Sequence, residues 1–118
     1  HVPLNAATEH IIGPATLQSM KRGAKIVNTA RGGLIDTDAL VEAVTSGHLS
    51  GAALDVFERE PLAIDSPLIA LPSVVLTPHI SWYSEESYGE LKDRTIRNVV
   101  DVLVGAVPRN IINPEGFR

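Results

Sequence analysis

The sequence predicts an α/β fold. Short apolar runs alternate with amphipathic stretches, and residues that favour helix ends stand between them. The chain has 118 residues, which allows one domain. Hydrophobic residues make up 44% of it and charged residues 20%, a composition that suits a globular domain with a sizeable core.

The first helix and strand are predicted near the N-terminus. A helix is expected over residues 14–21, because Pro14 is tolerated in a first turn and Gly23 favours the end. Residues 24–28 then form a short run with the β-branched Ile26 and Val27, typical of a buried parallel strand. This strand runs into residues 29–33, which we expect to form a flexible polar loop.

A second helix and strand follow. Asp36 or Thr37 can cap the helix, and Gly47 supplies a left-handed residue at its end. The strand is predicted over residues 51–56. Residues 57–72 contain three prolines and no sustained period, so a long irregular connection is expected there.

The last third of the chain predicts one more strand and a long helix. The strand covers residues 73–77 and is closed by Pro78 and His79. From residue 84 to about residue 103, apolar residues repeat at helical spacing with charged residues largely between them. Gly105 and Pro108 end this helix.

Composition argues against several classes of function. The net charge of −4 and the lack of a basic stripe argue against binding to nucleic acid or to an anionic membrane surface. Cysteine is absent, which excludes disulfides, thiolate metal sites and a cysteine nucleophile. No metal site is predicted, and the apolar runs are far shorter than the ~18 residues of a membrane span. A reducing, cytoplasmic location is the expectation.

Four polar residues stand just beyond the predicted strands, where open parallel sheets bind ligands. Arg31 follows the first strand, Asp55 and Glu60 lie around and after the second, and His79 follows the third. Arginine binds a carboxylate with two prongs, and histidine beside a carboxylate transfers protons near neutral pH. From spacing alone each is equally readable as a surface, turn or loop residue, and Trp82 as a core residue.

Three motifs resemble the D-isomer-specific 2-hydroxyacid dehydrogenases. They are NTARGGLID at residues 28–36, GAALDVFEREP at 51–61 and TPH at 77–79, and HVPLNAAT at 1–8 looks like the family's cofactor loop. The similarity covers nearly the whole chain. The run SWYSEE at 81–86 looks closest to the branch of the C-terminal-binding proteins, which are NAD-dependent corepressors. Dehydrogenases related to phosphoglycerate dehydrogenase look similar, so the branch stays open.

The resemblance implies reversible hydride transfer between a 2-hydroxy acid and NAD. Arg31 would hold the substrate carboxylate and polarise the carbonyl, His79 would be the general acid/base, and Glu60 would pair with His79. Arg31, His79 and Trp82 would line the substrate pocket. The implied cofactor contacts are Val2, Pro3, Leu4, Thr8, Thr29, Ala30, Arg31, Asp55 and His79.

The resemblance also implies the C-terminal half of a Rossmann-type, doubly wound parallel sheet. Residues 1–104 would belong to the NAD-binding domain, and residues 105–118 would return toward an absent substrate domain. The family's Gly-Xaa-Gly-Xaa-Xaa-Gly loop does not occur among the nine glycines, and the chain opens on His1, so we expect a piece of a longer chain.

These departures leave some functions open. The isolated chain is expected to bind NAD weakly, and the choice between NAD and NADP is not readable. The full-length protein is expected to be a homodimer. The alternatives are an NAD-sensing, corepressor-like regulator and an inactive fragment with a structural or interaction role.

Overall fold

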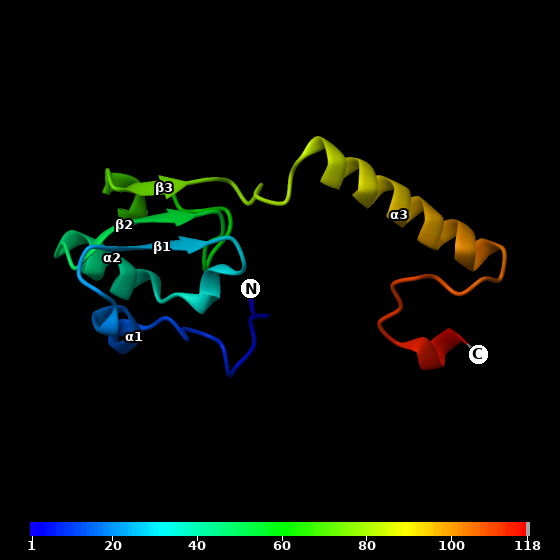
Figure 1. The fold of residues 1–118 in the computed structure, drawn as a ribbon, viewed down its shortest axis with the longest axis horizontal. Helices are drawn as coiled ribbons and strands as arrows, with labels where there is room; N and C mark the ends of the chain where they lie inside the picture. Colours follow the sequence, from blue (N-terminus) through cyan, green and yellow to red (C-terminus); the bar gives the residue numbers. More distant parts are fainter. Residues whose placement is uncertain (118) are drawn as a thin grey trace. The chain divides into compact units, whose positions relative to one another are not determined.

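The computed structural model describes residues 1–117 and confirms the α/β fold (Figure 1). The described chain divides into two compact units. The first is His1–Ser81, and the second begins at Trp82. None of the helices in residues 1–117 is long and apolar enough to cross a membrane.

The first unit is built on a sheet of three parallel strands in the order β1-β2-β3. The strands are β1 (Ala24–Asn28), β2 (Leu49–Leu54) and β3 (Val74–Leu76). The predicted bounds of β1 are confirmed, whereas β2 begins and ends two residues earlier than predicted. It starts early because Leu49 already pairs with Ala24, across a register shift before Lys25. Parallel pairing brings all three carboxyl ends to one edge.

Two helices precede β1 and β2. α1 (Pro14–Ser19) ends two residues before the predicted position, because Met20 adopts an extended backbone. α2 (Thr37–Thr45) is capped by Asp36, whose carboxylate accepts the N–H of Ala39 at 3.0 Å. Of the two predicted caps, Asp36 is therefore the one used.

The core of this unit lies among α1, α2 and one face of the sheet. Leu17, Leu40, Leu49 and Leu68 are each at most 2% exposed. On the other face, Val27, Ala53 and Val75 are aligned by strand pairing, and Val27 and Val75 are 69% and 62% exposed. The apolar packing that fixes the strand ends is thus one-sided.

Short 3-10 turns occur in two segments predicted to be irregular. η1 (Gly32–Leu34) ends the loop after β1 and buries Leu34. η2 (Pro67–Ala70) lies in the long connection, where Leu68 reaches the core. Leu68 therefore holds the long connection against the core, whereas Leu34 is buried outside the core cluster.

The second unit contains α3 (Glu85–Leu103) and the 3-10 turn η3 (Pro114–Phe117). Ser84 caps α3 in a reciprocal capping box with Ser87, and Glu85 and Glu86 complement the helix dipole in the first turn. Ion pairs one turn apart join Arg94 to Glu90 and Arg97 to Asp93. None of the α3 side chains is buried in the described chain. The predicted long helix is confirmed.

Candidate active site

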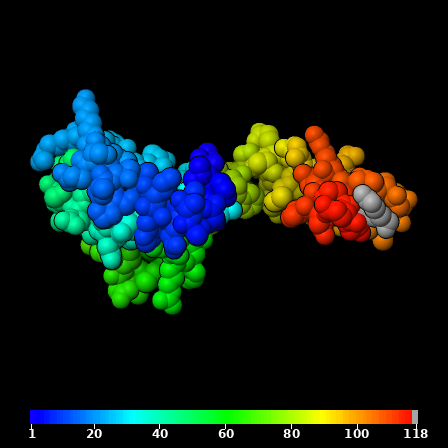
Figure 2. All heavy atoms as spheres, turned by 90° about the horizontal axis from the view of Figure 1, so that it is seen from below, coloured from blue at the N-terminus to red at the C-terminus, as the bar shows by residue number. Residues whose placement is uncertain are grey.

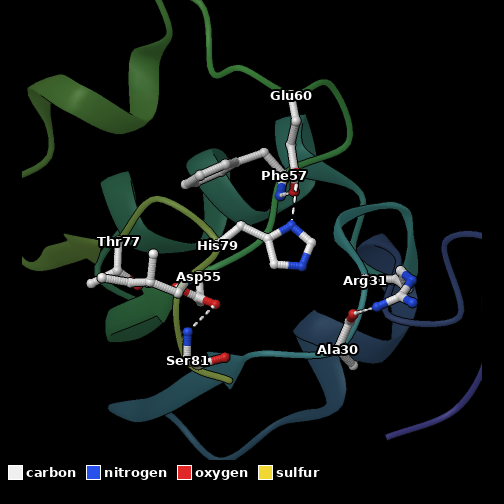
Figure 3. Close-up of polar contacts among 9 residues, drawn as sticks. Ala30, Arg31, Asp55, Phe57, Glu60, Thr77, His79 and Ser81 are labelled. Atoms are coloured by element: carbon white, nitrogen blue, oxygen red, sulfur yellow. Dashed lines mark hydrogen bonds and ion pairs between the residues drawn. The ribbon is translucent and has the colours of Figure 1, made fainter. Parts of the chain in front are cut away.

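The segments that leave the carboxyl ends of β1, β2 and β3 meet at one edge of the sheet (Figure 3). They are residues 29–33, 55–60 and 77–81. The first carries Arg31, the second Asp55 and Glu60, and the third His79, so topology brings together side chains that lie far apart in the sequence.

Glu60 and His79 form a hydrogen-bonded pair. Nδ1 of His79 lies 2.8 Å from Oε2 of Glu60, and Oε1 of Glu60 accepts the N–H of Phe57 at 3.0 Å. A carboxylate accepts only, so Nδ1 carries the proton and Nε2 is the ring's acceptor in the neutral state. In Figure 3, Nε2 lies on the side of the ring away from Glu60, toward Ala30 and Arg31.

The pair remains open to solvent, with the side chains of His79 and Glu60 46% and 38% exposed. The hydrogen bond from His79, assisted by the N–H of Phe57, holds the pKa of Glu60 below its ordinary value. Glu60 is therefore ionised at neutral pH, and it can orient the ring and stabilise its charged form.

Asp55 anchors the segment that carries His79. Its carboxylate accepts the hydroxyl of Thr77 at 2.5 Å and the N–H groups of Ile80 and Ser81, each at 2.9 Å. His79 has a φ of +55°, which is uncommon for a residue other than glycine and needs surrounding support. Asp55 supplies that support from both sides of the histidine.

Asp55 is only 3% exposed. Burial alone raises the pKa of this carboxyl, but the hydrogen bonds from Thr77, Ser81 and Ile80 outweigh it and hold the pKa well below its usual range. The structure thus gives Asp55 a role in positioning His79. Its predicted contact with the cofactor stays a prediction.

Arg31 directly precedes η1 and is exposed, with Nη1 donating to the carbonyl of Ala30 at 2.6 Å. Its loop is held by Asn28, for which the sequence suggested no role. The Asn28 amide donates to the carbonyl of Arg31 at 2.8 Å and accepts the N–H of Ala30 at 3.0 Å. Asn28 is 6% exposed, and a polar residue at the end of a buried strand was the available signal.

A hollow of about 610 Å³ opens beside this loop, lined by His1, Val2, Pro3, Leu4, Thr29, Ala30 and Arg31. Six of these seven residues are among the predicted cofactor contacts. Val2, Pro3 and Leu4 are apolar, whereas Thr29 and Arg31 are polar, and such a mixed lining suits a flat ring that carries a carboxamide. The residues therefore fit the nicotinamide end of NAD. Figure 2 shows the N-terminal residues, in dark blue, together on one face of the first unit.

Thr8 shapes the N-terminal loop and does not line that hollow. Its hydroxyl donates to the carbonyl of Pro3 at 2.6 Å and accepts the N–H of Asn5 at 2.9 Å. These bonds close a turn that presents residues 2–4. The predicted contact between Thr8 and the cofactor is thus supported only through the shape of the loop.

Gly32 brings two of the three segments into backbone contact. A Cβ at this position would lie 1.8 Å from the carbonyl carbon of Phe57 and 2.3 Å from the nitrogen of Glu58, so no side chain fits. Sequence reasoning missed this role, since the contact joins residues distant in the chain. The signal was the pair of glycines directly after Arg31.

Trp82 and His48 each have partners of their own. Trp82 lies in the second unit, where its ring meets that of Tyr83 edge-on at 5.6 Å, and its place in a substrate pocket stays a prediction. His48 lies outside the site: it is half-buried, and Nε2 of its ring lies 3.0 Å from the carbonyl oxygen of Leu17. Within residues 1–117, no group of three His, Asp or Glu side chains is placed to hold a metal ion.

Comparison with known proteins identifies the family of the chain. Residues 1–81 match the family model described as D-isomer specific 2-hydroxyacid dehydrogenase, NAD binding domain. A glyoxylate reductase of Thermofilum pendens is 44% identical over 118 residues, which are 100% of this chain and 35% of that protein. The chain thus spans about a third of the length of this relative.

Solved structures agree in fold. A protein of Thermus thermophilus superposes with a TM-score of 0.90 at 45% identity, over 95% of this chain and 36% of its own. The D-lactate dehydrogenase of Lactobacillus jensenii, solved with NAD⁺, gives 0.86 at 29% identity, over 95% of this chain and 38% of its own. Sequence and fold together place the chain in the D-isomer specific 2-hydroxyacid dehydrogenase family, as part of its NAD-binding domain.

Proposed function

We propose that this chain supplies the nicotinamide side of an NAD site and the proton-transfer pair of an oxidoreductase that interconverts 2-hydroxy and 2-oxo acids. The observation that carries the proposal is the 2.8 Å contact between His79 and Glu60 at the carboxyl edge of the sheet. The family match and the hollow beside Thr29 and Ala30 support the choice of cofactor.

His79 acts as the general acid/base. When bound, the reduced cofactor supplies the hydride that adds to C2 of the 2-oxo acid. The protonated ring gives its Nε2 proton to the carbonyl oxygen as the hydroxyl forms, and in the reverse direction neutral Nε2 takes that proton back. Glu60 keeps Nδ1 protonated throughout, so proton exchange with substrate is confined to Nε2.

Arg31 binds the substrate carboxylate. Its guanidinium has five N–H donors in a planar fork, and the carbonyl of Ala30 takes one of them. The remaining donors match a carboxylate with two prongs, and their charge polarises the neighbouring carbonyl. Holding both groups in line with His79 is the orientation that the reaction requires.

The relatives point to a small substrate. The Thermofilum pendens protein is named a glyoxylate reductase, so glyoxylate and short 2-oxo acids are the first candidates. The homodimer, the cytoplasmic location, the boundary at residue 104 and the pocket role of Trp82 rest on the resemblance and stay predictions. The corepressor-like alternative also stays a prediction.

The test is reduction of glyoxylate and longer 2-oxo acids by the full-length protein with NADH and, separately, NADPH. His79→Ala should lower kcat about 100-fold or more, while calorimetry gives nearly unchanged affinity for NAD. His48→Asn is the matched control, because it replaces a histidine outside the site. Wild-type turnover in His79→Ala would contradict the proposal.

A further inference from the structure

Glu58 lies two residues before Glu60, and its carboxylate binds two other elements. Oε1 accepts the N–H of Thr37, the first residue of α2, at 2.7 Å. Oε2 lies 3.0 Å from Nε2 of His10, which belongs to the N-terminal loop. One side chain therefore joins the segment after β2 to a helix and to the loop beside the cofactor hollow.

His10 is itself held in place. Its φ is +50°, and its backbone N–H donates to the carbonyl of Gly33 at 2.8 Å. Nδ1 of its ring lies 3.9 Å from the Asp36 carboxylate. The hydrogen bond to Glu58 raises the pKa of His10, and the charges of Glu58, Asp36 and Glu9 act in the same direction.

Residues 57–60 connect Glu58 to the proton-transfer pair. The backbone of Phe57 rests on Gly32, so the segment cannot slide toward the loop after β1. The N–H of Phe57 donates to Oε1 of Glu60, whose Oε2 faces His79. A displacement of Glu58 should therefore move the adjacent Phe57 and, through the hydrogen bond from the N–H of Phe57, the carboxylate of Glu60.

We propose that Glu58 and His10, here called the His10–Glu58 clasp, are positioning residues that hold Glu60 against Nδ1 of His79. The proposal rests on the proposed function, because it assigns the clasp to the same proton-transfer site. Neither residue touches the substrate. They act by fixing the carboxylate that selects the tautomer of His79.

A simpler role for Glu58 is to cap α2 and nothing more. Asp38, an exposed acid in the first turn of α2, stabilises the same helix end through its charge and takes no part in the contacts of Glu58 with Thr37 and His10. Asp38→Ala is therefore the matched control, since it weakens the same helix end and leaves the segment that carries Glu60 attached. The two roles predict different results for His79.

The experiment measures the tautomer of His79 by ¹⁵N chemical shifts in the full-length protein labelled at histidine, together with kcat and KM. In Glu58→Ala we expect the Nδ1–H tautomer to lose population toward the mixture of free imidazole. We also expect kcat to fall roughly tenfold while KM for the cofactor changes little. Asp38→Ala should lower the unfolding temperature and keep the wild-type tautomer.

Glu58→Gln should restore both readouts to within about twofold, because the amide still accepts from Thr37 and can donate to His10. Should Glu58→Ala not fold, Glu58→Asp carries the test, since its shorter arm cannot reach both partners and should move both readouts in the same direction. A wild-type tautomer and kcat in whichever variant folds, with only the unfolding temperature lowered, overturn the clasp.

The two proposals fail separately. If the wild type reduces no 2-oxo acid, the proposed function fails, and the tautomer of His79 in the variants still decides on the clasp. If the wild type is active and the tautomer does not respond to Glu58→Ala or Glu58→Asp, the clasp fails and the proposed function stands.

Discussion

The loop after β1 and the segment after β3 leave the same edge of the sheet, and each is held by one buried polar side chain of a different kind. On the β1 side, the neutral amide of Asn28 both donates to and accepts from the backbone around Arg31. On the β3 side, the carboxylate of Asp55 accepts three donors around His79. An amide suits a turn with a carbonyl and an N–H, whereas a carboxylate suits a turn that presents donors alone.

The difference also concerns charge. Asp55 brings a negative charge to the side where His79 becomes positive, while Asn28 leaves the side of Arg31 without one. In the proposed function Arg31 binds the substrate carboxylate, and a neutral partner suits that role because an acid at that position would compete for the guanidinium. The charged anchor, Asp55, thus lies beside the residue that is proposed to become positive, and the neutral anchor, Asn28, lies beside the residue that is proposed to bind an anion.

The largest expected effect comes from Asp55→Asn. The amide keeps the shape but turns a donor toward N–H groups that need an acceptor, so the segment with His79 should shift. We expect kcat to fall about 100-fold and the unfolding temperature to fall with it. Asp65→Asn, at an exposed loop acid, is the control. A wild-type kcat in Asp55→Asn would show that a carboxylate is not needed to hold the segment that carries His79.

Arg31→Lys should be the next largest. Lysine keeps the charge but cannot bind a carboxylate with two prongs. Loss of about 1.5–3 kcal/mol in the transition state corresponds to roughly one to two decades in kcat/KM. Steady-state kinetics measure it, with the exposed Arg22→Lys as control. An unchanged kcat/KM would show that the β1 side does not bind the substrate.

Asn28→Ala tests the neutral anchor. It leaves the N–H of Ala30 and the carbonyl of Arg31 without their partner, which should cost about 1–3 kcal/mol in the free energy of unfolding. Denaturant unfolding measures that loss, and we expect kcat/KM to fall about tenfold as the Arg31 loop loosens. If activity falls as far as in Asp55→Asn, the difference between a neutral and a charged anchor does not distinguish the β1 side of the site from the β3 side.

Glu60→Gln sharpens the comparison on the β3 side through pH. The folded state lowers the pKa of Glu60 below 4.5, so its ionised form stabilises the fold above pH 4.5 and that contribution disappears as the pH falls through the lowered pKa. The difference in unfolding temperature between wild type and Glu60→Gln should therefore be present at neutral pH and vanish in strong acid. A difference that does not depend on pH would show that charge plays no part.

The same variant should shift both pH–rate profiles. Without the carboxylate the charged ring of His79 is less stable, so reduction should lose activity at lower pH than in wild type. Oxidation, which needs the neutral ring, should gain activity at lower pH. Coincident profiles for wild type and Glu60→Gln would mean that the pair is not coupled.

The smallest expected effect is that of His10→Asn, behind both sides of the site. Asparagine tolerates the positive φ but carries no charge. The pKa of His10 is raised from 6.5, so its charged form stabilises the fold below pH 6.5 and is lost as the pH rises through the raised value. Glu58, whose pKa is lowered from 4.5, contributes above pH 4.5. The difference in unfolding temperature between wild type and His10→Asn should therefore be largest between pH 4.5 and pH 6.5.

The sequence predicted the elements better than the contacts between them. Strand β1 and the cap at Asp36 could be predicted because β-branched residues and capping chemistry are local properties. The short turn that buries Leu68 could not be predicted. Its segment contains three prolines and no regular apolar spacing, and the burial of Leu68 depends on core residues distant in the chain.

The candidate site divides in the same way. Arg31, Glu60 and His79 stand after strands and within motifs, so they could be proposed from the sequence. Asn28 bonds the backbone of the loop that follows it, and its one signal in the sequence is a polar residue at the end of a buried strand. Glu58 bonds the backbone of Thr37 and the ring of His10, which are distant in the chain, so its role becomes visible only in the folded structure.

The contact between Gly32 and Phe57 has a consequence for substrate size. Arg31 and Glu60 stand on two loops that touch backbone to backbone, so this contact sets how near the two loops lie to each other. In the proposed reaction this edge of the sheet holds the substrate carboxylate and the reacting carbon, which are the same in long and short 2-oxo acids. We therefore expect selection by length to act on the far end of the molecule, beyond the atoms that this edge holds.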